Sequence, residues 1–381
     1  MRDRILLIRG GRLLAPGEDL HGDVGDVLLV NGKIAGIAAA IPAPPQADII
    51  SLEGQYVSPG FIDGHGHFDM ENPMGIGLYH DAAGVRVGNS TVIDAGTTGA
   101  ENFPHFRKRY MDQGMTRLYA MLNLSCRGID TWAEESDVSR FDLKAIRQVV
   151  AGNRDRIVAI KVRSDREAVG RLGIYPCQMG QRIARELDLP LVIHIGEAEP
   201  FSTDILDLTD KGDMVTHCYN AYHPNGVWNS LIDDCGQIQR EAWRARERGV
   251  LFDVGHGTCS FSFPVARAMI EQEFFPNTIS TDIYTWNFVD PVGGLYRVMS
   301  KLLHLGMPLE DCVRAVTATP ADFFRLSGIG HLKEGMEGDL TVFRLLRTPM
   351  EMTDSNGRTE LCETLLLPEY VTVAGKAHRL C

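Results

Sequence analysis

The stretch Phe61-Ile-Asp-Gly-His-Gly-His67 decides how the rest of this chain is interpreted, because an apolar run ends there in two histidines separated by one glycine. In an extended strand, residues i and i+2 lie on the same face. His65 and His67 can therefore point to the same side and bind one cation. If this stretch belongs to a parallel barrel, its other strands should also end in polar side chains at the same rim.

Strand-like and helix-like stretches alternate along the middle of the chain. The strand candidates are residues 61–67, 91–97, 117–124, 157–163, 189–195, 214–217, 250–254 and 278–282. The helix-like stretches are residues 143–151, 177–186, 237–248, 264–271, 293–305 and 309–318. This alternation over about 250 residues predicts an α/β fold, namely a (β/α)8 TIM-type barrel. An open doubly wound sheet is the rival, but no Gly-x-Gly-x-x-Gly opens a helix after the first strand, which argues against its dinucleotide-binding version.

Both ends of the chain have the sequence pattern of short strands, with apolar runs separated by turn residues. Asn31-Gly32 lies between two apolar runs and predicts a β-hairpin, because this pair suits a turn with positive φ at both positions. Near the other end, residues 338–343 and 370–376 are strand candidates, the second bending at Ala374-Gly375. Neither end alone has enough strands to bury a core. We expect residues 1–57 and 332–381 to form one small β-sandwich domain, and residues 58–331 to form the barrel domain.

Polar side chains occur at the ends of four further strand candidates. Lys161, His194, His217 and Asp282 lie at or near the carboxyl ends of the fourth, fifth, sixth and eighth candidates. Each of them alone has an ordinary structural explanation, such as a hydrogen-bonded histidine or an aspartate that caps a helix. Together with His65 and His67 they would converge on the mouth of the barrel, where active sites of this fold lie.

This set of side chains suits divalent transition metals, zinc above all, because imidazole and carboxylate are their usual ligands. Lys161 is an unusual member, since an ammonium group repels a cation. A carbamate formed from the neutral amine and CO2 would resolve this, because its two oxygens could bridge two metals. Two metals roughly 3.5–4 Å apart can share a hydroxide and polarise a carbonyl group.

Composition excludes several classes of function. The chain has 381 residues, with 38 Lys+Arg against 50 Asp+Glu and a net charge of −12, so nucleic acid is not an expected partner. No apolar run is long enough to cross a membrane, and the start of the chain has too short an apolar core for a secretory signal. Eight cysteines without a Cys-x-x-Cys pair favour reduced thiols and a cytoplasmic location.

Several longer motifs resemble the amidohydrolase superfamily. The opening stretch Val57-Ser-Pro-Gly-Phe-Ile-Asp-Gly-His-Gly-His67 is similar to its first signature, and 317–321 and 335–343 are similar to its closing segments. Four shorter motifs resemble its dihydroorotase-like deacetylases, which hydrolyse N-acetyl-D-amino acids or acetylated (R)-2-hydroxy acids such as acetyl-(R)-mandelate. These motifs are Ile160-Lys-Val-Arg, His194-Ile-Gly-Glu-Ala, His217-Cys-Tyr-Asn and Asp253-Val-Gly-His-Gly.

The resemblance implies a role for each of the six polar residues. His65, His67 and Asp282 would hold the more buried metal, and His194 and His217 the outer one. Carboxylated Lys161 would bridge the two metals together with a hydroxide. Asp282 would accept the proton of the attacking hydroxide and pass it to the leaving group. The chain would then be a dinuclear metal-dependent hydrolase that acts on an amide or ester bond.

A second group of residues is expected to contact substrate. Arg163 shares the inward face with Lys161 and could grip a substrate carboxylate through its bidentate fork, although a salt bridge at the rim is the alternative. His256 lies between two glycines that allow close approach to a ligand. Tyr284 follows Asp282 and could wall the pocket. Asn220 and Tyr222 are weaker candidates.

Other functions stay open at this point. The same residues could open a cyclic amide, as dihydroorotase does, or the fold could serve as a non-catalytic scaffold. A non-catalytic scaffold would be expected to lack some of the metal ligands, whereas this chain has all six candidate ligands. A mononuclear deaminase does not need the lysine of the fourth strand. The expected partner is a small molecule that carries a carboxylate, and a homo-oligomer is compatible with the sequence.

Overall fold

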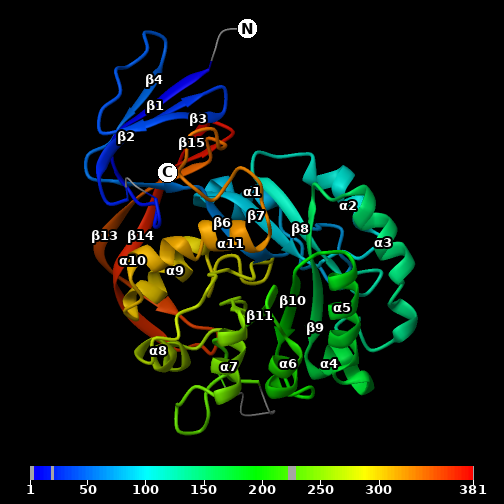
Figure 1. Cartoon of the computed structure of the whole chain (residues 1–381). Coiled ribbons are helices and arrows are strands. Elements are labelled where there is room, and N and C mark those ends of the chain that lie inside the picture. The colour runs from blue at the N-terminus through cyan, green and yellow to red at the C-terminus, as the bar shows by residue number, and fades with distance from the viewer. Residues whose placement is uncertain (1–3, 19–20, 222–228, 381) are drawn as a thin grey trace.

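The computed structural model describes residues 4–18, 21–221 and 229–380. Their strands form two sheets, one of seven parallel strands and one mixed sheet of eight (Figure 1). The parallel sheet lies among the helices, and the mixed sheet gathers the strands from the two ends of the chain. None of the helices in these ranges is long and apolar enough to cross a membrane.

The parallel sheet has the order β12-β11-β10-β9-β8-β7-β6, so neighbours in the sequence are neighbours in the sheet. Its strands are β6 (Phe61–Gly66), β7 (Asn89–Ala95), β8 (Arg117–Asn123), β9 (Ile157–Ser164), β10 (Leu191–Ile195), β11 (Asp213–Thr216) and β12 (Leu251–Phe252). Seven of the predicted strands are therefore present, with ends that differ by a few residues. Every residue of β6, β7 and β9 is buried, as expected for parallel strands covered on both faces.

The eighth predicted strand, residues 278–282, forms no regular strand. Single parallel bridges join Asp253 to Thr278 and Gly66 to Ile283, so the segment 278–283 connects to both outer strands of the sheet. Its polar side chains make hydrogen bonds to neighbouring segments in place of regular strand pairing. For example, the Thr281 hydroxyl donates to Asp63 at 2.6 Å. These contacts bring the two edges of the curled sheet together around residues 278–283.

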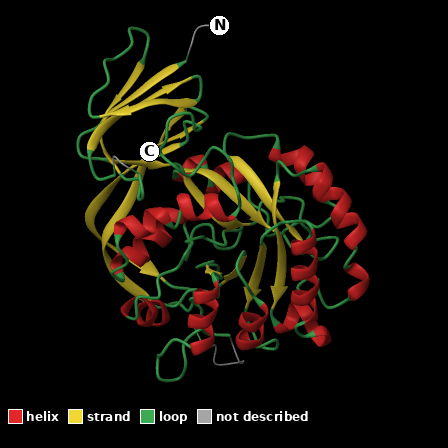
Figure 2. Ribbon diagram, in the orientation of Figure 1, coloured by secondary structure: helices red, strands yellow, loops and turns green. Residues whose placement is uncertain are grey.

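The two faces of the parallel sheet pack against different layers. One face, with residues such as Val92, Ile160 and Ile193, belongs to the main core beneath the helices. The other face, with Ile93 and Met214 among others, packs on itself and on residues 321–329. Successive side chains along each strand therefore point alternately into these two apolar layers. Figure 2 shows the helices outside the sheet.

The helices follow most of the predicted stretches. They are α1 (His80–Ala83), α2 (Phe103–Phe106), α3 (Leu143–Gly152), α4 (Arg166–Val169), α5 (Tyr175–Glu186), α6 (Ser202–Leu208), α7 (Arg240–Arg248), α8 (Phe263–Glu271), α9 (Leu295–His304), α10 (Leu309–Arg314) and α11 (Ala318–Phe323). The predicted helix at residues 309–318 is wrong in extent. It ends at Arg314 and a new helix begins at Ala318, because Thr317 between them has φ of −133° and ψ of −90°, outside the helical region.

The mixed sheet joins strands that are far apart in the sequence. They are β1 (Ile5–Leu13), β2 (Val24–Val30), β3 (Lys33–Ala38), β4 (Asp48–Ser51), β5 (Tyr56–Pro59), β13 (Leu340–Thr353), β14 (Thr359–Val373) and β15 (Lys376–Arg379). Strand β5 pairs with β1 on one side and β13 on the other, so strands from both ends share one sheet. The hairpin at Asn31-Gly32 is present, with φ values of 51° and 89° that fit a two-residue turn.

The last two strands differ from the expectation. Ala374 and Gly375 have φ values of 47° and 69° and form a tight reversal between β14 and β15, rather than a bend within one strand. Strands β13 and β14 also form a much longer hairpin than the sequence predicts, and this hairpin curves past α9 toward the parallel sheet (Figure 1). Its tip, residues 354–358, hydrogen-bonds to the segment that follows β12.

Candidate metal centre

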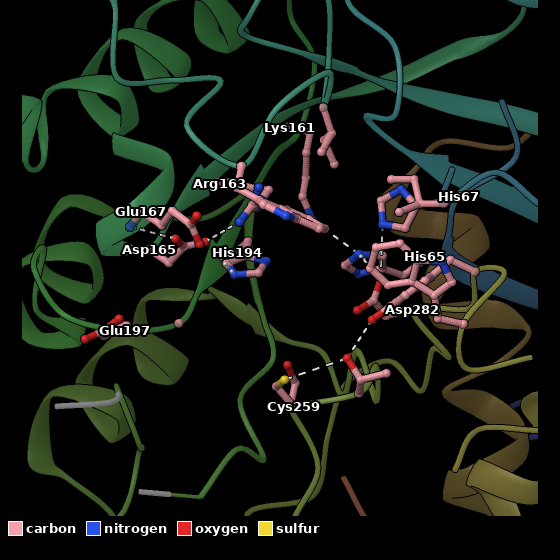
Figure 3. Close-up of a pocket in the computed structure, with 18 residues that line it drawn as sticks. His65, His67, Lys161, Arg163, Asp165, Glu167, His194, Glu197, Cys259 and Asp282 are labelled. Carbon is pink, nitrogen blue, oxygen red and sulfur yellow. Dashed lines mark hydrogen bonds and ion pairs between the residues drawn. The ribbon is translucent and has the colours of Figure 1, made fainter. Parts of the chain in front are cut away.

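The six strand-end residues come together at the carboxyl edge of the parallel sheet. His65 lies in β6 and His67 directly follows this strand. Lys161 lies in β9, His194 in β10, His217 follows β11, and Asp282 belongs to the segment 278–283. A cavity of about 390 Å³ opens over them, and Figure 3 shows its side chains. Among the described residues its wall includes His65, His67, Lys161, Arg163, His194, Asp282 and Tyr284, whereas His217 lies directly behind His194.

His65, His67 and Asp282 form the tightest group. Ligand atoms of the three residues all lie within 4.8 Å of one another. The Asp282 Oδ1 atom is 3.1 Å from Nε2 of His67 and 3.4 Å from Nε2 of His65. Two imidazoles and one carboxylate at this spacing are a suitable donor set for a divalent metal.

The other three residues border this group. The His217 ring lies 5.0 Å from the His65 ring and 4.2 Å from the His194 ring, measured between centroids. The Lys161 Nζ atom is 3.4 Å from Nε2 of His65, which is its one hydrogen-bond partner among the described residues. The charge of Lys161 also acts on His194 and His217, so this amine is close to both pairs of histidines.

The two histidines of β6 each use one ring nitrogen for a supporting contact. Nδ1 of His65 lies 3.2 Å from the hydroxyl of Thr216, and Nδ1 of His67 lies 2.8 Å from the hydroxyl of Thr97. Both Nε2 atoms then face Asp282. Supporting partners of this kind are typical of metal-binding histidines, because they fix the ring and its tautomer.

His194 and His217 are held in the same way. Nε2 of His194 lies 3.3 Å from an oxygen of Asp165, and Nδ1 of His217 donates to the carbonyl of Gly255 at 2.7 Å. Nδ1 of His194 and Nε2 of His217 are then the ring nitrogens that could bind a metal. His217 and Asp282 also have left-handed backbones, with φ of 71° and 47°, a costly conformation that tends to occur at functional sites.

The charge states of these groups favour metal binding. Burial, together with Lys161 and the neighbouring histidines, lowers the pKa of His65 and His217 well below its usual range, so their lone pairs are available. Burial alone would raise the pKa of Asp282, but the surrounding imidazoles hold it below its usual value. The site therefore offers neutral imidazoles and an ionised carboxylate, which fits a divalent cation.

Lys161 fits the reaction with CO2 proposed from its position. Burial lowers the pKa of its amine to about 8, although Asp282 and Asp253 partly offset this shift. About a fifth of an amine with this pKa is neutral at pH 7.4, far more than of an ordinary lysine, and only the neutral amine can form a carbamate. Gly96 makes room for this side chain, since a Cβ there would lie 2.8 Å from Lys161 Cγ.

Arg163 lines the cavity but is engaged by acidic neighbours. One of its terminal nitrogens lies 3.0 Å from Glu134, the other lies 2.7 Å from Asp165, and the guanidinium packs over Trp132 at 5.5 Å. Burial raises the pKa of Glu134 to about 7 against the opposing pull of Arg163. The rim salt bridge is thus present, and contact with a substrate carboxylate stays a prediction.

The remaining candidates have different surroundings. His256 does not line the cavity: it is buried, stacked on Phe261, and its Nε2 accepts from the buried Lys301 at 2.8 Å. Asn220 donates to the carbonyl of His217 at 2.9 Å, which places it behind that histidine. Tyr284 lines the cavity and its hydroxyl lies 2.5 Å from that of Thr258. Tyr222 lies outside the described residues.

Sequence reasoning missed four residues near the centre. Asp165 alternates with Lys161 and Arg163, so the two-residue period of a strand could have revealed it. Asp253 opens one of the motifs quoted above but was given no role, and Trp132 and Lys301 carried no comparable signal. Their partners, such as the carbonyls of Pro291 and Thr353 for Lys301, come from distant parts of the chain.

Comparison with known proteins agrees with this geometry. The model of the amidohydrolase family matches residues 56–376. A deacetylase of Enterococcus faecalis is 36% identical over 368 residues, which is 96% of this chain and 98% of that protein. The crystal structure of an adenine deaminase is 35% identical with a TM-score of 0.91, covering 98% of this chain and 99% of that one. The crystal structure of a dihydroorotase is 33% identical with a TM-score of 0.90, covering 99% and 98%.

The family match covers most of the chain, and the relatives cover nearly all of it. Members of the family generally use a divalent metal, and the His65–His67–Asp282 group is a suitable site for one. The chain therefore belongs to the amidohydrolase family and is a hydrolase that acts on carbon–nitrogen bonds.

Proposed function

We propose that this protein is a dinuclear zinc deacetylase that hydrolyses an N-acetyl-D-amino acid or the ester of an acetylated (R)-2-hydroxy acid such as acetyl-(R)-mandelate. The observation that carries the proposal is the place of Lys161, a buried amine close to both the His65–His67–Asp282 group and the pair His194–His217. A carbamate on this lysine would supply one anionic ligand to each of two metals. The similarity to a named deacetylase over almost the whole chain supports the acetyl group as the part removed.

In this proposal His65, His67 and Asp282 hold the inner zinc ion, His194 and His217 hold the outer one, and carboxylated Lys161 joins them. The two ions would supply an activated water molecule and polarise the scissile carbonyl. Everything else depends on the side chains. Thr97, Thr216, Asp165 and the Gly255 carbonyl orient the four imidazoles, so the ligand set is arranged before a metal binds.

Asp282 is the proposed catalytic residue. Its Oδ1 atom faces both histidines of β6, and its low pKa keeps it ionised and able to accept a proton. As a water molecule attacks the carbonyl carbon, the carboxylate oxygen takes a proton from that water, and it gives this proton to the nitrogen or oxygen that departs when the acyl bond breaks. Asn287 donates to the carbonyl of Asp282 at 2.8 Å and helps to hold this residue in its left-handed conformation.

The rest of the cavity suggests how a small acid would bind. Trp132, Trp286 and Tyr284 form a continuous aromatic wall of the cavity, with ring centroids 6.2 Å and 5.9 Å apart along it. The Tyr284 end of this wall lies next to His67, with ring centroids 6.1 Å apart. The apolar part of the substrate would pack there, while Arg163 would face its carboxylate. His256 and Asn220 would act indirectly, through Lys301 and the His217 carbonyl.

The proposal extends to the architecture of the chain. The parallel sheet, closed through residues 278–283, would be the (β/α)8 TIM-type barrel of a catalytic domain at 58–331. The mixed sheet would be the small β-sandwich domain formed by 1–57 and 332–381. We place the enzyme in the cytoplasm, acting on a small molecule, and a homo-oligomer is compatible with this arrangement.

A hydrolysis screen tests the substrate class. Zinc-loaded enzyme should release acetate from acetylated D-amino acids or (R)-2-acetoxy acids with a kcat/KM at least tenfold above that for their mirror images. Dihydroorotate and adenine belong in the same screen, since the two similar crystal structures bear the names of a dihydroorotase and an adenine deaminase. Turnover of either ring without release of acetate would reject the deacetylase in favour of that activity.

A further inference from the structure

A buried carboxylate beneath the metal centre gathers three hydroxyl groups. Oδ2 of Asp253 accepts from Thr216 at 2.6 Å and from Ser280 at 2.7 Å, and Oδ1 accepts from Thr278 at 2.6 Å. Asp253 is 2% exposed and does not line the cavity. Its Oδ2 lies 3.8 Å from Nδ1 of His65, an ion-pair contact beyond hydrogen-bond distance, so its side-chain hydrogen bonds lead to the histidines through other groups. The two hydroxyls on Oδ2 each lead to a different histidine.

The first path runs through Thr216 to His65. A hydroxyl has one proton, and that of Thr216 is donated to Asp253. The oxygen of Thr216 can then only accept, so Nδ1 of His65, 3.2 Å away, must carry the proton that joins them. The lone pair of His65 is thereby directed to Nε2, the atom that faces Lys161 and Asp282.

The second path runs through Ser280 and the backbone of Gly255 to His217. Ser280 donates to Asp253 and accepts from the N–H of Gly255 at 3.1 Å. The carbonyl of the same residue accepts from Nδ1 of His217 at 2.7 Å. Gly255 has a φ of +48°, and a Cβ there would lie 2.3 Å from the Thr216 hydroxyl, so this peptide is held tightly between the two paths.

We infer that Asp253 is a positioning residue that prepares both metal sites at once, because it fixes the tautomer of His65 through Thr216 and the ring of His217 through Ser280 and Gly255. The inference rests on the proposed dinuclear centre. Thr97, which supports His67, is held by a different carboxylate, that of Asp94, so the paths from Asp253 lead to His65 and His217.

The experiment measures how fast zinc leaves the protein for a chromogenic chelator. Loss of an outer hydrogen-bond partner typically weakens metal binding by 10–100-fold. Thr216→Val should release the zinc held by His65 about 10–100 times faster than the wild type. Thr216→Ser keeps the hydroxyl and should release zinc at the wild-type rate. Ser280→Ala should accelerate release of the zinc held by His217 instead. Anomalous diffraction after partial chelation identifies which site empties.

Thr278→Val is the matched control, since Thr278 also donates to Asp253 but reaches no histidine. It should release zinc at the wild-type rate, and thermal unfolding of the metal-free variants corrects for general loss of stability. Asp253→Asn should accelerate release from both sites. If that variant does not fold, the Thr216 and Ser280 variants still decide the matter.

Release at the wild-type rate from Thr216→Val, or equal acceleration in Thr278→Val, would overturn the inference. So would a wild-type protein that binds no zinc at His65 and His217. The readout counts metal rather than turnover. A protein that holds two zinc ions with the expected variant pattern, yet hydrolyses no acetylated acid, would refute the proposed substrate and leave the role of Asp253 standing.

Discussion

The amine of Lys161 lies 3.4 Å from Nε2 of His65, and both side chains are buried. A charged ammonium at this position would repel the metal that His65 is oriented to bind. The pair is therefore compatible only if the amine is neutral or chemically modified when the metal is present, and this requirement leads to the first two predictions.

If carboxylated Lys161 bridges two metals, as proposed, Lys161→Ala should lose more than 99% of the activity and about one zinc ion per chain, because that bridge is removed. A short carboxylic acid such as propionate should restore part of both, since its two oxygens can occupy the place of the carbamate. Zinc content and acetate release are measured together. Wild-type zinc content and turnover in the variant would contradict the bridging role.

Formation of the carbamate should depend on pH through Lys161 itself. Its pKa is lowered to about 8 by burial, so the neutral, reactive amine accumulates as the pH rises to that value. Activation of metal-free protein by zinc, at a constant concentration of dissolved CO2, should accelerate from pH 6 to about 8 and then level off. An activation rate that still rises steeply from pH 9 to 10 would indicate an amine with its ordinary pKa.

Asp282→Asn should retain zinc at His65 and His67 but reduce kcat by a factor of about 10²–10⁴, the usual contribution of a positioned acid or base. The amide keeps the shape of the side chain but cannot accept the proton. Metal analysis alongside kcat separates this result from simple loss of the metal. Turnover within a factor of three of the wild type would remove Asp282 from the catalytic role.

Arg163 has two possible functions, and the structure allows them to be separated. If it only neutralises Glu134 and Asp165, Arg163→Met should destabilise the protein by about 3–5 kcal/mol, because two buried carboxylates lose their partner. If it also binds substrate, the variant should lose the preference for a free carboxylate over its methyl ester. Urea unfolding and paired kcat/KM values for acid and ester measure the two effects.

Glu134→Gln provides the control for Arg163. It removes one of the two ion pairs of Arg163 but leaves the guanidinium in place, so it should keep the preference for the free acid. An unchanged preference in Arg163→Met would assign the residue to structural support alone.

The tip of the long β13–β14 hairpin should influence substrate binding. The hydroxyl of Ser355 accepts from the N–H of Phe261 at 3.2 Å and donates toward the carbonyl of Gly257 at 3.1 Å. Residues 257 and 261 flank the loop 258–260, which forms part of the cavity wall. Ser355→Ala should raise KM several-fold with little change in zinc content. Thr359→Ala, on the same hairpin but away from this loop, should leave KM unchanged.

Much of the centre could be predicted because of one regularity. Polar residues that end otherwise apolar strands must meet at one rim when the strands are parallel, so His65, Lys161, His194 and His217 could be grouped from the sequence. The same reasoning over-extended the last strand, since residues 278–282 use side-chain hydrogen bonds to Asp63 and Asp253 in place of a regular ladder.

The supporting residues were harder to predict. Thr216 precedes His217 in the sequence yet supports His65, which lies on a different strand. Asp253 collects hydroxyls from two other segments, and Lys301 points from a helix to carbonyls of Pro291 and Thr353. Such contacts depend on the relative height and twist of neighbouring strands, which local patterns of polarity do not encode.

The pairing of β5 with β13 has a consequence for biosynthesis. Val57 in β5 pairs with Val342 in β13. One edge of β5 therefore has no partner strand until nearly three hundred further residues have been synthesised. During translation this edge exposes unpaired peptide groups, which are prone to join other chains. Ribosome-bound fragments that stop before β13 should therefore be more dependent on chaperones than fragments that include it.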